Sequence, residues 1–241
     1  MGGQGSAEEL TLIGLRGLAA DRLRGEFRRR TESGMEPSDF LFDGPQDAPI
    51  TLVLAHGAGA PMNSTFMNVV ARGVAEGGIR VARFEFPYMR ERRQGGSRHA
   101  PDPGPVLKQS WLAAIAQLGG AERLVIGGKS LGGRIASMVA DEAGVRGLVC
   151  LGYPFHPPGK PERLRTKHLE TLRTFALIVQ GTRDALGSRE DMAGYHLSTS
   201  IRIAWIEDGD HSFKPRKSSA RTEAQNLSEA IVRVQEFLSG L

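Results

Sequence analysis

The amino-acid sequence predicts an α/β protein with a doubly wound, mostly parallel sheet and helices on both faces. From residue 51 onward, short apolar segments alternate with longer segments of helical periodicity. Several of the short segments are apolar on both faces, as are strands of a parallel sheet that is covered on two sides. Because strands that alternate with helices form right-handed βαβ units, we expect one sheet.

Seven segments have the length and the β-branched or leucine-rich composition of strands. Six are expected in the parallel part of the sheet: 51–55, 79–86, 123–126, 147–151, 174–179 and 201–206. The seventh, 40–42, stands before Gly44 and Pro45, which favour a turn. We interpret it as an antiparallel strand at the edge of the sheet.

Two segments show the spacing of an amphipathic helix most clearly. The first covers residues 107–118, with prolines before it and Gly119 after it, as is usual at helix starts and ends. The second occupies the end of the chain, where one face carries Leu227, Ile231, Val234, Phe237 and Leu238.

Cysteine content and charge exclude several classes of protein. Cys150 is the one cysteine, so neither a disulfide within the chain nor a multi-cysteine metal site can form. We expect a cytoplasmic protein with no cofactor and no bound metal. Cys150 lies in a predicted strand and is interpreted as a small buried hydrophobic residue. No run of 18 apolar residues exists, so no transmembrane helix and no membrane partner are expected.

The formal net charge is only +4, although arginines gather in two runs at 22–30 and 90–98. Aromatic residues are not interleaved with them in the way that a base-stacking platform requires. We therefore interpret these runs as solvated surfaces and expect no nucleic-acid partner.

The first 34 residues differ in character from the rest and are interpreted as an N-terminal extension. Apolar residues at helical spacing predict an amphipathic helix over 7–30, whereas Gly14, Gly17 and Gly25 favour a flexible segment. Both alternatives stay open. Residues 35–241 are expected to form a single domain, because no linker or internal repeat follows residue 50.

The segment from Gly128 to Gly132 has the pattern G-x-S-x-G, with Ser130 at its centre, between a predicted strand and a predicted helix. Such a turn presents a serine hydroxyl from a strained backbone at a helix N-terminus. A Cβ at either glycine would clash inside the turn, and Gly133 lets the helix approach the sheet. The alternatives are a plain glycine-rich connection and a phosphate cradle, and the second lacks the spacings of known phosphate loops.

Two later loops supply an acid and a base. A serine hydroxyl needs a base to take its proton, and folds with this turn supply the partners in the order serine, acid, histidine. Asp184 follows the strand that ends at 179, and His211 follows the strand that ends at 206. Because the carboxyl ends of parallel strands share one sheet edge, we expect both beside Ser130. Other acids near the histidine compete with Asp184: Glu207, Asp208 and Asp210.

Backbone N–H groups are expected to form an oxyanion hole. One belongs to Leu131, directly after the serine, and the other to the loop 56–60 after the first parallel strand. Ala58 is the first candidate in that loop and Gly59 the second. His56 is expected to hold the loop by hydrogen bonds.

These segments together resemble the α/β-hydrolase superfamily. The motifs are LAHGAG at 54–59, FEFPY at 84–88, GGKSLGGR at 127–134, GYPFHPPGKP at 152–161 and GDHSF at 209–213. They are similar to those of a bacterial hydrolase-like family, which is related to the eukaryotic testis-expressed and NSL-complex hydrolase-like proteins and, more distantly, to dienelactone hydrolases. The resemblance covers roughly residues 38 to 240. It implies a cofactor-free serine hydrolase fold and no particular substrate, and dienelactone hydrolases differ in using a cysteine nucleophile.

Residues around the same edge are expected to select the substrate. Gly59, Tyr88 and Lys129 are the candidates for substrate contact. Residues 152–173, where larger hydrolases insert a cap domain, predict a minimal lid and an open, shallow site. The loop after residue 86 carries arginines that either attract an anionic ester, thioester or acidic protein surface, or form a solvated loop: Arg90, Arg92, Arg93 and Arg98.

The predicted function is hydrolysis of a small ester or thioester through an acyl-serine intermediate. Ser130 would attack, His211 would act as the base, and Asp184 would orient the imidazole. The alternative is a non-catalytic binding or scaffold protein that retains the fold. The intact triad favours the enzyme, while the basic loops and the complex subunits among the relatives favour the scaffold. A small molecule is the expected partner, and a protein partner stays open.

Overall fold

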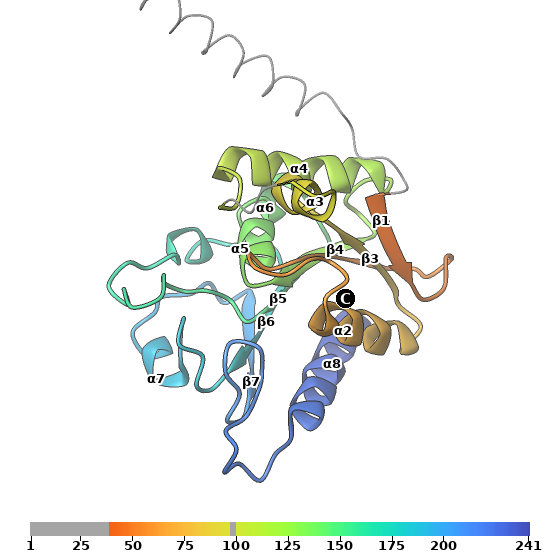
Figure 1. The fold of residues 1–241 in the computed structure, drawn as a ribbon. Coiled ribbons are helices and arrows are strands. Elements are labelled where there is room, and N and C mark those ends of the chain that lie inside the picture. The colour runs from red at the N-terminus through yellow and green to blue at the C-terminus, as the bar shows by residue number, and fades with distance from the viewer. Residues whose placement is uncertain (1–38, 97–99) are drawn as a thin grey trace, which may run out of the picture. The chain divides into compact units, whose positions relative to one another are not determined.

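A seven-stranded sheet forms the centre of the computed structural model, which describes residues 39–96 and 100–241 (Figure 1). The strands follow the order β1-β3-β2-β4-β5-β6-β7. Neighbouring strands run parallel, except that β1 (Phe40–Asp43) pairs antiparallel with β3 (Arg80–Phe84). The predicted mostly parallel sheet and its antiparallel edge strand are therefore confirmed.

The other strands lie within a few residues of the predicted segments. Their bounds are β2 (Thr51–Ala55), β4 (Leu124–Lys129), β5 (Gly147–Leu151), β6 (Ala176–Gly181) and β7 (Ile201–Ile206). β4 and β6 extend further than their apolar runs, because Lys129 still pairs with Leu151 and Gly181 with Ile206. Glycine, glutamine and lysine at these ends concealed them in the sequence.

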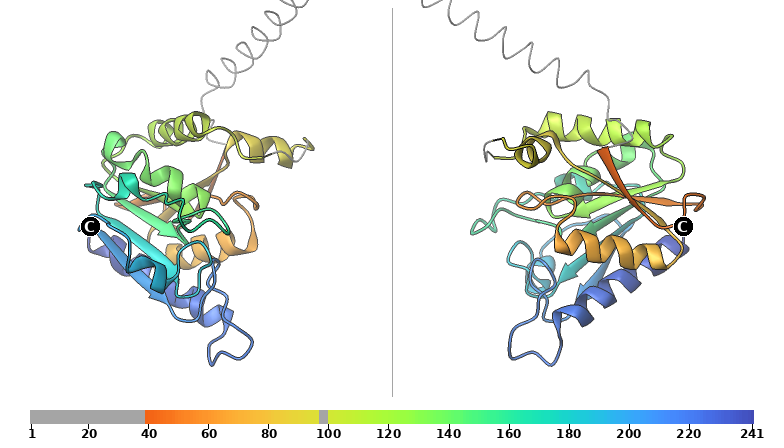
Figure 2. Two further views of the ribbon diagram at one scale, coloured as in Figure 1. Left: turned by 90° about the vertical axis from the view of Figure 1, so that its left-hand side faces the viewer. Right: turned by 45° about the vertical axis from the view of Figure 1, so that its right-hand side comes forward.

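Helices cover both faces of the sheet, which confirms the doubly wound architecture (Figure 2). α2 (Thr65–Glu76) and α8 (Glu223–Ser239) pack against each other on one face. α4 (Gly104–Gln117) and α5 (Leu131–Ser137) lie on the other face and also contact each other. The shorter elements are α3 (Pro87–Arg93), α6 (Ala140–Ala143), the 3₁₀ helix η2 (Lys167–Leu169) and α7 (Arg189–Met192).

The segment after residue 86 is helical, which corrects its prediction as a loop. Pro87 is the first residue of α3, where its fixed φ suits a helix and its missing N–H costs nothing. Tyr88 and Met89 are buried, so one turn of the helix packs against the body of the domain. The arginines that follow concealed this short amphipathic pattern.

The main hydrophobic core lies between the sheet and the pair α2 and α8. Alternate strand residues such as Leu52 and Leu54 of β2 point into it, because side chains two apart share a face of a strand. They meet Val74 of α2 and Val234 of α8, which are fully buried. This core holds the strands in register and so fixes where each strand ends.

The described residues belong to one compact unit that ends at Leu241. The predicted N-terminal extension 1–34 and Arg98 lie outside the described residues. In the part of the chain that the structure describes, no helix is both long and apolar enough to cross a membrane.

Candidate active site

Ser130 lies at the turn between β4 and α5 in a backbone conformation that L-residues rarely adopt. Its φ is 50° and its ψ is −110°. Such strain costs on the order of 1–3 kcal/mol and persists only where the surroundings enforce it. Here the Ser130 N–H bonds to the Leu151 oxygen at 3.1 Å, and its own carbonyl accepts the Arg134 N–H at 2.9 Å. The strand on one side and the helix on the other hold the turn.

Glycines allow the backbone segments around Ser130 to touch. A Cβ on Gly128 or on Gly132 would overlap the carbonyl oxygen of Ala55 in the neighbouring strand. A Cβ on Gly133 would lie 2.7 Å from the Gly128 oxygen. The predicted reason for these three glycines, close approach in the turn, is confirmed.

The three side chains predicted to act together meet at the carboxyl edge of the sheet. His211 Nε2 lies 2.8 Å from Ser130 Oγ, and His211 Nδ1 lies 2.8 Å from Asp184 Oδ2. Because an ionised carboxylate can only accept, Nδ1 donates to Asp184, and Nε2 is left to accept from the serine hydroxyl. The side chain of Asp184 is fully buried, whereas that of His211 is 29% exposed. The base can therefore reach a bound molecule while its acid is shielded from water.

Hydrogen bonds satisfy both oxygens of the buried Asp184. The side-chain amide of Gln180 donates to Oδ2 at 2.8 Å, and the Leu186 N–H donates to Oδ1 at 2.8 Å. A buried carboxylate is costly unless it is bonded in this way. Sequence reasoning missed Gln180, although a signal was present: it is a polar residue at the end of an otherwise apolar strand.

The competing acids near His211 are engaged elsewhere. Asp208 forms ion pairs with Arg183 at 2.8 Å and with Arg216 at 2.7 Å. Asp210 accepts backbone N–H bonds of its own turn at 2.8 and 3.0 Å. The side chain of Glu207 is 64% exposed. Of the four candidates, Asp184 is the one that contacts the imidazole.

The loop 56–60 after β2 is held by His56. Its Nδ1 donates to the Gly57 oxygen at 2.6 Å, and its Nε2 accepts the Phe86 N–H at 3.2 Å. These two bonds require the neutral tautomer with the proton on Nδ1. Burial lowers the pKa of His56 and so favours the same neutral form. The predicted holding role of His56 is confirmed.

Tyr88 contacts the same loop, 56–60, through its hydroxyl group. Its hydroxyl lies 3.3 Å from the Gly57 oxygen and 3.1 Å from the Ala58 oxygen, and its side chain is fully buried. Because a trans peptide is planar, fixing a carbonyl on one side directs the N–H of the next residue to the other. Tyr88 therefore orients the N–H groups of Ala58 and Gly59. This positioning role corrects its prediction as a substrate contact.

Lys129 also points away from open solvent and is only 8% exposed. Its ammonium donates to the His211 carbonyl at 2.7 Å and lies 5.6 Å from the centre of the Phe66 ring. Burial lowers the pKa of Lys129 to about 8, against the attraction of Asp184 and Asp210, which raises it. Lys129 thus ties the serine turn to the loop that carries His211, which corrects its prediction as a substrate contact.

Three predicted backbone donors lie at accessible positions. Ala58 and Gly59 are exposed, and Leu131 is half-buried. The Leu131 N–H opens α5, and the first N–H groups of a helix have no acceptor within it. A Cβ on Gly59 would meet no atom within 4 Å, so this residue borders open space beside the site. Leu131, Ala58 and Gly59 can therefore donate to a bound molecule.

Two of the arginines that were predicted to attract an anion are held in ion pairs. Arg93 lies 2.8 Å from the buried Glu85, and Arg90 lies 3.1 Å from Asp39. The guanidinium of Arg92 lies 5.8 Å from the centre of the Tyr88 ring. These contacts brace α3 against the domain, so the segment differs from the predicted solvated loop.

Cys150 is fully buried in β5, with its sulfur 3.5 Å from the Gly133 oxygen. Burial raises the pKa of its thiol, so the thiolate is disfavoured. Its interpretation as a small buried hydrophobic residue is confirmed. Within 39–96 and 100–241, the side chains of His, Cys, Asp and Glu form no group of three that could hold a metal ion.

Three features define the α/β-hydrolase class: the order of the strands in the sheet, the serine turn between a strand and a helix, and an acid and a histidine that follow later strands. The family described as alpha/beta hydrolase domain matches residues 48–239, and the chain belongs to this family. Between β5 and β6, only the short η2 interrupts an irregular segment, so the lid is minimal, as predicted.

Several solved structures are similar to this chain. A dienelactone hydrolase from Anabaena variabilis has a TM-score of 0.63 at 20% identity, covering 83% of this chain and 90% of that chain. A monoacylglycerol lipase from Paleococcus ferrophilus has a TM-score of 0.61 at 14% identity, covering 83% and 98%. An α/β serine hydrolase without lid from Xanthomonas campestris has a TM-score of 0.52 at 18% identity, covering 81% and 88%. At these identities, the likeness shows the fold alone.

Proposed function

We propose that the protein is a serine hydrolase that cleaves small ester or thioester bonds through an acyl-serine intermediate. One observation carries the proposal: Ser130 Oγ, the two ring nitrogens of His211 and Asp184 Oδ2 form a continuous hydrogen-bonded line with 2.8 Å at each step. This geometry prepares a serine hydroxyl for attack. The esterases, lipases and serine hydrolases among the similar structures support the same class of chemistry.

In the first half of the reaction, Ser130 Oγ attacks the carbonyl carbon while its proton passes to His211 Nε2. The N–H groups of Leu131 and Ala58, with Gly59 as the second candidate in the loop, stabilise the oxyanion. When the intermediate collapses, the C–O or C–S bond to the leaving group breaks, and His211 returns the proton to that group. Asp184 stays ionised and stabilises the imidazolium.

In the second half, water attacks the acyl carbon and gives a proton to His211 Nε2. The bond between the acyl carbon and Ser130 Oγ then breaks, and His211 returns the proton to the serine. The products are a carboxylic acid and an alcohol or thiol. The short lid favours small acyl groups, because residues 152–173 supply no helical cover beyond η2.

The motifs also support a closer placement among the bacterial hydrolase-like proteins related to the testis-expressed and NSL-complex proteins. Some of those relatives resemble complex subunits, so a non-catalytic binding role is the outcome to test against. A cytoplasmic location and a single catalytic domain after residue 34 are further parts of the proposal.

Labelling with a fluorophosphonate probe tests the chemistry directly. The wild-type protein is expected to be modified at Ser130, and both Ser130→Ala and His211→Ala are expected to lose the label. Ser212→Ala is the matched control, because it removes an exposed hydroxyl beside the histidine and should label normally. A folded wild-type protein that takes up no label and hydrolyses no p-nitrophenyl ester would favour the binding role.

A further inference from the structure

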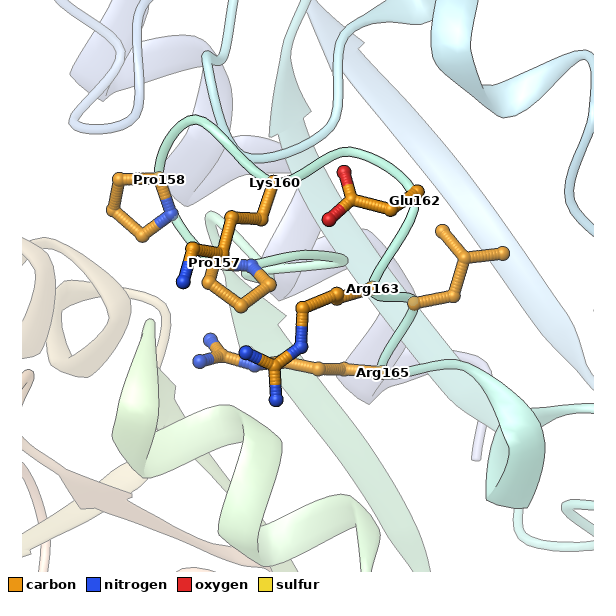
Figure 3. A pocket seen from close by; sticks show the side chains of 7 residues that line it. Pro157, Pro158, Lys160, Glu162, Arg163 and Arg165 are labelled. Atoms are coloured by element: carbon orange, nitrogen blue, oxygen red, sulfur yellow. The ribbon is translucent and has the colours of Figure 1, made fainter.

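The lid segment contains a positively charged hollow that the proposed mechanism does not use. Its volume is about 870 Å³, and its lining includes Pro157, Pro158, Lys160, Arg163 and Arg165 (Figure 3). We call it the lid hollow. Pockets for small organic ligands span about 300–1,000 Å³, so the lid hollow has room for such a molecule.

The cations of the lid hollow lack anionic partners in the described part of the chain. Figure 3 shows the guanidinium groups of Arg163 and Arg165 close together and the carboxylate of Glu162 apart from both. Neither arginine nor Lys160 belongs to any ion pair within 4.0 Å among residues 39–96 and 100–241. This contrasts with α3, whose Arg90 and Arg93 are paired.

Other positive charges lie close to Arg165. The pKa of Arg165 is lowered first by burial and then by the positive charges of Arg134 and Arg163. Guanidinium groups that are held together without an anion repel one another. Clusters of perturbed charges of this kind are enriched at functional sites.

Arg134 connects this cluster to the candidate active site. It lies in the first turn of α5, where its N–H donates to the Ser130 carbonyl at 2.9 Å. Its Nε is buried and has no hydrogen-bond partner among the described residues. The pKa of His168 is lowered to about 4, first by burial and then by the charges of Arg134 and Lys108. His168 is therefore neutral near neutral pH and adds no positive charge to this cluster.

Two contacts place the segment around Arg165 beside the carboxyl edge of the sheet. The Tyr153 hydroxyl donates to the Arg165 carbonyl at 3.0 Å. Tyr153 follows Gly152, where a Cβ would press on the backbone carbonyl of His211. The chain that carries Arg165 is therefore anchored next to the loop of the proposed base.

We propose that the lid hollow binds a phosphate-bearing part of the substrate, so that the enzyme prefers phosphate-bearing esters or thioesters to neutral ones. The proposal rests on the proposed function. Lys160, Arg163 and Arg165 line the lid hollow with three positive charges against the one carboxylate of Glu162. The fork of a guanidinium matches phosphate oxygens. A single carboxylate would leave part of this charge unpaired, whereas one or two phosphate groups balance it.

Kinetics with two matched thioesters test the preference. Acetyl-coenzyme A carries phosphates on its leaving group, and the acetyl thioester of N-acetylcysteamine carries none. The wild-type protein is expected to hydrolyse acetyl-coenzyme A with a kcat/KM at least about tenfold higher, since hydrogen bonds between guanidinium and phosphate groups are among the stronger ones. The double variant Arg163→Gln/Arg165→Gln is expected to lose this advantage while its activity on the neutral thioester is unchanged.

Arg173→Gln is the matched control. Arg173 belongs to the same segment, but its side chain is 84% exposed and it precedes β6, at the amino edge of the sheet. It should leave both activities unchanged. Equal kcat/KM for the two thioesters in the wild type, or an equal loss in Arg173→Gln, would overturn the proposal.

Binding without chemistry separates this proposal from the proposed function. A ligand that binds only the folded state raises its Tm. Sodium pyrophosphate, compared with NaCl at equal ionic strength, is expected to raise the Tm of the wild type and of Ser130→Ala, but not that of the double variant. This result with no hydrolysis of any ester would overturn the enzyme and leave the anion site standing. Ester hydrolysis with no pyrophosphate shift would overturn the anion site alone.

Discussion

The serine turn at 127–133 and the lid segment at 152–173 meet at the same edge of the sheet, yet they are built in opposite ways. In the serine turn, glycines press against neighbouring carbonyl groups and leave no space for a methyl group. In the lid segment, prolines and arginines surround an open hollow, and these arginines form no ion pair with any residue that the structure describes. The comparison separates two roles: backbone contacts fix the position of Ser130, while we propose that side-chain charge on the lid segment selects the substrate.

The largest expected effect is on catalysis at the serine turn. Ser130→Ala should lower kcat for p-nitrophenyl acetate by about 10⁶-fold, because it removes the hydroxyl that lies 2.8 Å from His211 Nε2. The fold should be retained, since alanine needs no more space than serine. A residual rate within tenfold of the wild type would remove Ser130 from the mechanism. Steady-state kinetics beside Ser212→Ala provide the measurement.

The next effect concerns the fit of the turn. Gly132→Ala should lower the free energy of unfolding by about 3 kcal/mol or more, because the new methyl group would overlap the carbonyl oxygens of Ala55 and His56. Gly104→Ala is its control: a Cβ there meets no atom within 4 Å, at the first residue of α4. Urea denaturation of both variants measures the difference. Similar stabilities would contradict the close contact.

A buried cation of the turn should differ from the lid cations in its response to pH. The folded-state pKa of Lys129 is about 8, against 10.5 for the free side chain. Below pH 8 the buried charge of Lys129 lowers the free energy of unfolding by its full amount. This destabilisation decreases as the pH rises from 8 to 10.5. The wild type should therefore gain up to roughly 3 kcal/mol over Lys129→Met across that window.

Denaturation of the two proteins at a series of pH values measures this gain. Arg163→Gln serves as the comparison from the lid, because it removes an exposed cation rather than a buried one. A constant difference between wild type and Lys129→Met would show that the ammonium is not destabilised by burial.

A smaller effect is expected from the support beneath the oxyanion loop. Tyr88→Phe removes the hydroxyl that contacts the Gly57 and Ala58 carbonyls. If the N–H groups of the loop 56–60 form the proposed oxyanion hole, the kcat should fall about tenfold with little change in KM, because such groups act on the transition state. Activity toward a series of short p-nitrophenyl esters gives both constants. A rise in KM with constant kcat would instead place Tyr88 in ground-state binding.

The smallest effect should come from the stability of the lid. Arg163→Gln is expected to change the free energy of unfolding by less than about 0.5 kcal/mol, as is usual for exposed positions without partners. Removing one of the crowded cations should, if anything, raise stability. Thermal unfolding measures it. A large loss would mean that the arginine holds the lid together.

Sequence reasoning found most of the fold and the three side chains that meet at the candidate active site, because their signals are local. A polar turn after an apolar strand marked Asp184 and His211, and glycine spacing marked Ser130. The need for a glycine at position 127 could not be predicted. A Cβ there would overlap the Val149 carbonyl of the adjacent strand, and that contact exists only after the strands pair.

The direction in which a side chain points was the other feature that the sequence did not reveal. Tyr88 and Lys129 stand in the expected segments, but they point inward to hold carbonyl groups of other loops. That choice depends on how α3 packs on the loop 56–60 and on where the His211 loop closes. The proline at the start of α3 was a usable sign of the helix, and it was outweighed by the arginines that follow.

Gln180 joins the acid to the beginning of the lid. Its amide bonds to Asp184 at one side, and to the backbone N–H and carbonyl of Tyr153 at the other, all within the interior. The tip of the lid between 158 and 163 makes no such bond to the acid. Longer peptides or whole modules could therefore be grafted into that tip while the acid keeps its place.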